Sequence, residues 1–244
     1  NNENYNLYSS SFNAINLIND LLDTDYKSKI KKIFHNDFKV IIKVDKTHLD
    51  KEYVINNLIG YLVFSDSEIK DADLEAFFSN SKKIRLTIRS TIDEKITTLY
   101  SDIAKPFVNR YEFIKGFDQG NLDFYSIKKN NLSNSKLIID NFKVQEVPAL
   151  AKLLTLASLQ GIADLLTGEG IRFSDFEMNF SNEKNLMKIN ELYAIGPAIS
   201  ILMDGYIEGK NLISLRGTMV PATTINRTIS SIPLIGNILV GKKV

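Results

Sequence analysis

Apolar and polar residues alternate along most of this chain, and this alternation constrains its fold more than any other feature. From Phe38 to Val44, for example, apolar side chains recur at every second position. Successive side chains of a β-strand point to opposite faces, so a period of two predicts strands with one apolar and one polar face. The apolar residues that we place on this face are Phe38, Val40, Ile42, Leu62, Phe64, Ile84, Leu86, Ile88, Leu122, Phe124, Phe176, Met178, Phe180, Ile199, Ile201, Met203, Ile213, Leu215 and Met219.

Short polar segments separate the alternating runs, as hairpin loops do. They lie at residues 65–67, 129–131, 181–185 and 208–211. Asn, Ser, Asp and Gly are the residues that tight turns favour. The sequence therefore predicts a mainly β fold of repeated antiparallel hairpins, with one face in water.

Two segments share an internal pattern that predicts curvature. Residues 137–144 and 187–194 are both apolar at their first, third, sixth and eighth positions, so the alternation changes parity midway. A one-residue β-bulge at residues 140–141 and at residues 190–191 would return both halves to one face, and repeated bulges bend a sheet. We expect a strongly curved sheet with Ile199, Ile201 and Met203 on its concave face.

Helical patterns are few. Residues 1–37 form a helical connecting segment in this interpretation, and residues 102–108 form a short helix. Residues 148–166 form a longer helix, with Pro148 in its first turn and apolar residues over more than a narrow stripe. A last short helix is expected at residues 225–230, before the apolar residues 232–240.

This helical content is too small to cover the apolar face of such a sheet. The face must therefore close into a barrel or sandwich core, or hold a hydrophobic ligand. Composition leaves both alternatives open, since 44% of the 244 residues are hydrophobic. The absence of cysteine excludes disulfides and thiolate chemistry, and a net charge of +1 with interspersed signs argues against a nucleic-acid partner.

No catalytic or metal-binding constellation is present in the sequence, so we expect neither enzymatic activity nor a cofactor. His35 and His48 have no ligand partners at a useful spacing. Gly168 and Gly170 follow a helical pattern and precede a strand, the reverse of the order in a phosphate-binding loop. The carboxylates of Asp175, Glu177 and Asp204 fall on the polar faces of expected strands.

Several motifs resemble the AsmA-like family of envelope proteins, especially its YhdP-type members. Residues 215–222, LRGTMVPA, followed by residues 232–239, IPLIGNIL, look like the signature of the family's C-terminal region. Residues 142–173 are similar to its strand, apolar helix and GEGI turn, and residues 194–198 to its YGPA corner. Residues 38–78 resemble its upstream repeats more weakly.

The resemblance implies a taco-shaped β-groove of the bridge-like lipid-transfer kind. Residues 38–101 would be an upstream groove repeat and residues 102–244 the C-terminal-type region, in a chain that continues beyond both ends. Such a protein carries phospholipid acyl chains across the periplasm toward the outer membrane, from an inner-membrane anchor that would lie outside this sequence. The expected partners are phospholipids, the rest of its own chain and a membrane surface reached through residues 148–166. The alternative is an assembly factor for outer-membrane proteins that pairs with client β-strands.

Overall fold

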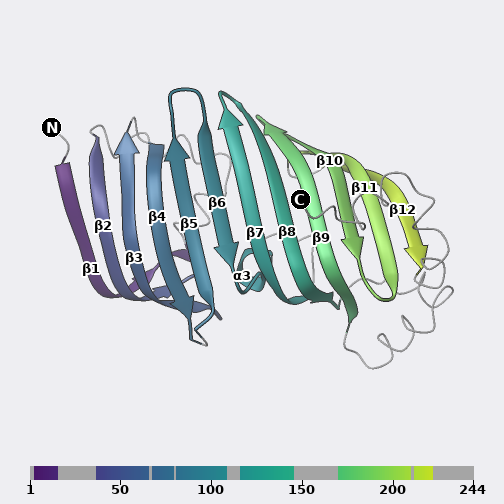
Figure 1. The fold of residues 1–244 in the computed structure, drawn as a ribbon, viewed down its shortest axis with the longest axis horizontal. Coiled ribbons are helices and arrows are strands. Elements are labelled where there is room, and N and C mark those ends of the chain that lie inside the picture. The colour runs from purple at the N-terminus through teal and green to yellow at the C-terminus, as the bar shows by residue number, and fades with distance from the viewer. Residues whose placement is uncertain are drawn as a thin grey trace, which may run out of the picture.

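Twelve strands pair side by side, in chain order, in one open, curved sheet (Figure 1). The computed structural model describes residues 3–15, 37–65, 68–79, 81–108, 116–145, 170–209 and 212–221. The strands are β1 (Glu3–Asn13), β2 (Phe38–His48), β3 (Val54–Ser65), β4 (Glu68–Phe78), β5 (Lys83–Ser90), β6 (Lys95–Ser101), β7 (Phe117–Lys129), β8 (Leu132–Val144), β9 (Ile171–Glu183), β10 (Leu186–Ile195), β11 (Ile199–Glu208) and β12 (Leu212–Pro221), and a helical turn, α3 (Lys105–Val108), lies between β6 and β7.

The predicted fold class, a mainly β groove-like sheet with few helices, is confirmed. All neighbouring pairs from β2 to β12 are antiparallel, whereas β1 pairs with β2 in parallel. The sheet is therefore mixed, not purely antiparallel.

The helical assignment of residues 1–37 was wrong for residues 3–13, which form β1. Tyr5 and Leu7 of β1 alternate with asparagines and lie opposite Val40 and Ile42 of β2. The alternation covers only a few positions of β1, so the sequence pattern did not reveal this strand. The helices expected at residues 148–166 and 225–230, and the apolar residues 232–240, lie outside the described residues.

The expected hairpin loops are confirmed where the pairing register reaches them. Lys129 pairs with Leu132, and Glu183 with Leu186, so each of these turns has two residues. The first turn residues, Asn130 and Lys184, have φ angles of 53° and 54°. Positive φ at this position is the conformation that two-residue hairpins require.

The predicted bulge at residues 190–191 is confirmed, whereas the one at residues 140–141 takes a different form. The register of β10 shifts between Ile189 and Glu191 against β9. In β8 the alternation does reverse at Asn141, which has a φ of 55°, so that Ile139 and Phe142 are both buried. The register of β8 with β7 and β9 nevertheless stays continuous. Gln119 of the neighbouring strand β7 also has a positive φ, 65°, so the side-chain alternation of β7 reverses at the same level. Because both strands reverse together, their pairing needs no extra residue.

The short helix expected at residues 102–108 is reduced to the single turn α3. Its residue Val108, with the preceding Ala104, packs into a buried cluster that includes Phe117, Leu122 and Ile139. The backbone N–H of Ala104 donates to the carbonyl oxygen of Gly120 at 2.8 Å, which ties the start of the turn to β7. The best-packed core therefore lies at the end of the strands where β6 leads into α3.

Candidate functional site

The apolar face of the sheet, defined by Leu62, Leu86, Phe124 and Ile201, is the candidate site. Residues directly opposite each other on paired strands share a face, so the pairing register can be followed from strand to strand. It joins one residue from every strand into a single line, which we call the central row. The central row is Leu7, Ile42, Gly60, Leu74, Leu86, Leu99, Phe124, Leu137, Met178, Leu192, Met203 and Gly217.

Two further rows flank the central row on the same face. One runs through Val40, Leu62, Ala72, Ile88, Thr97, Ser126, Ser135, Phe180, Ile189, Gly205 and Leu215, and we call it the hydroxyl row after its middle members. The other runs through Ala76, Ile84, Ser101, Leu122, Ile139, Phe176, Ala194, Ile201 and Met219. None of the three rows contains an ionisable residue.

The residues proposed from the sequence for an apolar face do lie on one face. Ile42, Leu86, Phe124, Met178 and Met203 belong to the central row, and ten others belong to the two flanking rows. Phe38 and Phe64 pair with each other, while Ile199 and Ile213 lie two residues from Ile201 and Leu215 on their strands. The register therefore brings all nineteen residues together on one surface.

Several members of this face were missed in the sequence. Leu74 and its neighbours Ala72 and Ala76 come from β4, whose alternation was hidden because alanine is a weak apolar signal. Leu99 comes from β6, where threonines dilute the pattern. In β4 a period of two is nevertheless present, and Asp71, Asp73 and Glu75 at the alternate positions could have identified it. In β6 the apolar residues Ile96 and Leu99 fall on opposite faces, so its sequence carries no such signal.

Burial varies across the apolar face. Near α3, Phe142 stacks between Phe117 and Phe173, with ring centroids 5.2 Å apart on each side. These rings are almost fully buried. On β12, the last strand of the sheet, Ile213 is 51% exposed and Met219 is 38% exposed. The face is therefore a packed core at one end and an accessible apolar surface along its last strand.

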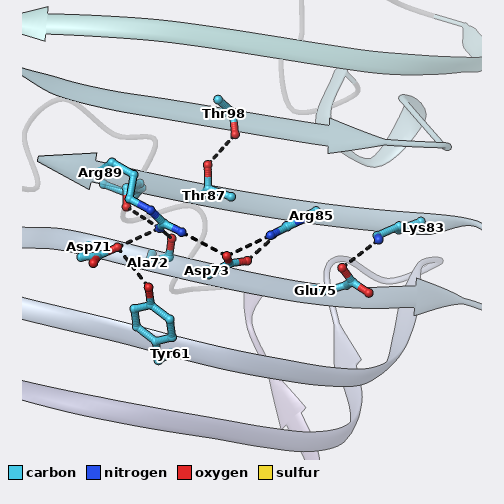
Figure 2. A network of polar contacts seen from close by, with 11 residues as sticks. Tyr61, Asp71, Ala72, Asp73, Glu75, Lys83, Arg85, Thr87, Arg89 and Thr98 are labelled. Carbon is cyan, nitrogen blue, oxygen red and sulfur yellow. Dashed lines mark hydrogen bonds and ion pairs between the residues drawn. The ribbon is translucent and has the colours of Figure 1, made fainter.

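The opposite, polar face carries a network of ion pairs over β4 and β5 (Figure 2). Asp73 accepts hydrogen bonds from Arg85 at 3.0 and 3.1 Å and from Arg89 at 3.1 Å. The bond from Arg85 lowers the pKa of Asp73, burial opposes this effect, and Arg89 lowers the pKa further. Arg89 also contacts Asp71, at 2.8 Å. These side chains are partly exposed, as expected of the face that meets water.

The three carboxylates singled out in the sequence also lie on the polar face. Glu177 accepts a hydrogen bond from Tyr193 at 2.9 Å and pairs with Lys136 at 2.8 Å. Burial tends to raise the pKa of Glu177, but the contacts with Lys136, Asn179 and Tyr193 lower it overall. Asp204 pairs with Arg216, and Asp175 accepts from Ser174. Each carboxylate thus has a cross-strand or local partner.

Two adjoining cavities lie at the α3 end of the sheet. One, of about 430 Å³, is lined mainly by polar residues that include Lys105, Asp118 and Asn121. The other, of about 560 Å³, includes His48 and Phe78, and both cavities share Tyr53 and Ile103. Lys105 pairs with Asp118 at 3.2 Å. His35, the other histidine, lies outside the described residues.

Within the described residues, no group of three or more His, Cys, Asp or Glu side chains could hold a metal ion. No helix among them is long and apolar enough to cross a membrane. No protein-family model matches the chain, and neither the curated proteins nor the solved structures gave a significant match.

Proposed function

We propose that this protein is a non-enzymatic conduit for phospholipids, which carries acyl chains along the apolar face of its sheet. The observation that carries the proposal is the central row, because it runs through all twelve strands with only apolar residues and glycine. A flexible hydrocarbon chain needs a long, continuous surface without charges. The central row is such a surface, because it contains no charged residue. Burial of apolar area supplies the binding free energy, roughly 0.8 kcal/mol for each buried CH₂ group.

The resemblance of residues 142–173 and 215–222 to AsmA-like envelope proteins supports the same function. On this proposal the protein works in the periplasm, held at the inner membrane by a segment outside this sequence, and passes lipid toward the outer membrane. Residues 148–166 would contact a membrane surface. No cofactor and no nucleic acid take part.

Mass spectrometry of lipids extracted from the purified protein tests the conduit. We expect phospholipid to co-purify, and a labelled phospholipid to move between donor and acceptor vesicles faster with the protein present. A β-sheet protein of similar size serves as the control. The proposal would be overturned if this protein yields no more phospholipid than the control and does not accelerate transfer.

A second candidate function is supported by the exposure of β12. Leu212 and Ile213 are 46% and 51% exposed on this edge strand, and an edge strand can pair with an added strand. On this alternative the protein assists the assembly of outer-membrane proteins by pairing with their β-strands. A co-purifying peptide cross-linked to β12, with no phospholipid on the apolar face, would favour it over the conduit.

A further inference from the structure

Three exposed leucines lie at the hairpin turns that lead into β8, β10 and β12. Leu132, Leu186 and Leu212 are 41%, 44% and 46% exposed, and each is the first residue of its strand. Glu183 lies opposite both Leu132 and Leu186. Glu208 lies opposite both Leu186 and Leu212. The register therefore places leucine and glutamate alternately in one line over β8 to β12, and we call these five residues the leucine–glutamate row.

The leucine–glutamate row lies on the face opposite the candidate lipid-binding surface. Glu183 and Glu177 are separated by an even number of residues on β9, so both carboxylates belong to the polar face. The row follows the end of the strands opposite α3 (Figure 1). A partner bound to this row leaves the apolar face free, so the inference does not depend on the proposed function.

The two glutamates of the row are exposed and have no partner of their own. Neither makes an ion pair or a side-chain hydrogen bond within the described part of the chain, whereas Glu177 and Asp204 on the same face both form ion pairs. Single exposed leucines are common on protein surfaces, but aligned ones form a continuous apolar surface that a partner can bury. The row therefore offers apolar contact at three points and negative charge at the two points between them.

The spacing of the row matches an α-helix. Neighbouring strands lie about 4.8 Å apart, so the row presents one side chain every 4.8 Å or so and is about 19 Å long. A helix laid across the strands advances about 5.4 Å per turn, so it can place one residue of each turn against each member of the row. A strand in the same position would present residues of one face only about every 7 Å and would lose register with the row.

We propose that the leucine–glutamate row binds an amphipathic helix of another protein, in which apolar and basic residues alternate from turn to turn along one face. The apolar residues of this helix pack on the three leucines, as in other complexes in which a helix is bound through its apolar face. Its lysines or arginines pair with Glu183 and Glu208. Leu186 lies at the centre of the row with a glutamate on each side, so it should contribute most to affinity.

A membrane surface fits this row less well than a helix does. The carboxylates of Glu183 and Glu208 lie between the leucines, so insertion of the leucines into a bilayer would also remove these charges from water, which is costly. Anionic lipids would in addition repel the carboxylates. A basic helix instead satisfies both kinds of side chain at once.

Fluorescence anisotropy of two labelled synthetic peptides tests the proposal. Each peptide is a helix of about five turns, or about 18 residues, with leucine and a charged residue alternating from turn to turn on one face and alanine and glutamine elsewhere. The charged residue is lysine in one peptide and glutamate in the other. We expect the wild type to bind the lysine peptide at least about tenfold more tightly than the glutamate peptide.

Two variants of the row separate its apolar and charged contributions. Leu186→Ser should weaken binding of the lysine peptide about tenfold, as the loss of a central contact does. Glu183→Gln/Glu208→Gln should remove the preference for the lysine peptide. All these positions are exposed, so the circular dichroism spectrum and thermal unfolding should stay as in the wild type.

Ile92→Ser and Asp45→Asn/Glu52→Gln are the matched controls, because they remove an apolar side chain and two carboxylates from exposed positions outside the row. Both should bind the lysine peptide as the wild type does. Binding of neither peptide, equal binding of both, or equal losses in the row and control variants would overturn the proposal. Flotation with phosphatidylcholine vesicles that depends on Leu186, without binding of the lysine peptide, would also overturn it and would assign the row to a membrane surface.

Discussion

Ile201 of β11 lies directly opposite Met219 of β12 on the apolar face, where a half-buried residue meets an exposed one. This pair marks the boundary between the packed part of the face and its accessible part. A charge placed here therefore distinguishes a groove from a closed core.

Ile201→Asp should impair lipid binding more than folding. In a closed core, an unpaired carboxylate would cost several kcal/mol and unfold the protein. On an accessible face the carboxylate keeps contact with water, so we expect a loss of about 1–2 kcal/mol in the free energy of unfolding. Acyl chains that pass this point would meet a charge, so phospholipid retained per protein should fall severalfold.

Ser200→Asp is the control for this charge, because Ser200 is the adjacent residue on the polar face. Thermal unfolding and extracted phospholipid are measured for both variants. A completely unfolded Ile201→Asp protein, or equal lipid in the two variants, would show that β11 does not line a groove.

Asp73→Asn should destabilise the sheet at neutral pH but not in acid. The pKa of Asp73 is lowered from 3.8 in the folded state by its arginine contacts. A lowered carboxyl pKa contributes stability that is present above the unfolded value and is lost as pH falls through the folded value. Since Arg85 and Arg89 are both 47% exposed, we expect a loss of only about 0.5–1 kcal/mol at pH 7.

Urea unfolding of the wild type and Asp73→Asn at pH 7 and near pH 3 checks this expectation. The two curves should differ at pH 7 and converge in acid. Asp45→Asn, a change at an exposed position on β2, should have little effect at either pH. A difference for Asp73→Asn that is as large at pH 3 as at pH 7 would contradict an electrostatic role.

Phe142→Ala should be among the most destabilising single changes. Its ring is 6% exposed, stacks on Phe117 and Phe173 and meets Phe176 edge to face at 6.2 Å. Removing a buried phenylalanine from such a cluster costs about 3–5 kcal/mol. Chemical denaturation measures the loss, and Tyr125→Ala, at a 42% exposed position on β7, provides the comparison. Similar losses for both would mean that the aromatic stack is not a core.

Gly60→Ala should disrupt the pairing of β3 with β4. Gly60 has a φ of 142°, and a Cβ there would lie 1.8 Å from the carbonyl oxygen of Asp73. The strands would have to separate, so we expect a loss of about 3 kcal/mol or more. Gly209→Ala isolates the cost of a positive φ, since Gly209 has a φ of 58° but no atom within 4 Å of its added Cβ. It should cost about 1 kcal/mol. Equal losses in thermal unfolding would rule out the steric explanation.

The sequence by itself determined the two faces of most strands and the hairpin turns between them. Ile199, Ile201 and Met203 could be assigned to one face because the pleat alternates side chains within a single strand, whatever its neighbours are. The turn at Asn130 and the bulge beside Asn190 were likewise readable, since both depend on a few adjacent residues.

Only the tertiary structure decided how the strands align. The parallel pairing of β1, the reversal shared by Gln119 and Asn141, and the joining of Leu74 and Leu99 into the central row all depend on register between strands. The same holds for Leu132 and Leu212, which are distant in the sequence and fall in one row only when the strands from β8 to β12 pair. Alternation is a property of one strand, but register is set by the packing and turns of two, so the continuous rows could not be derived from the sequence pattern alone.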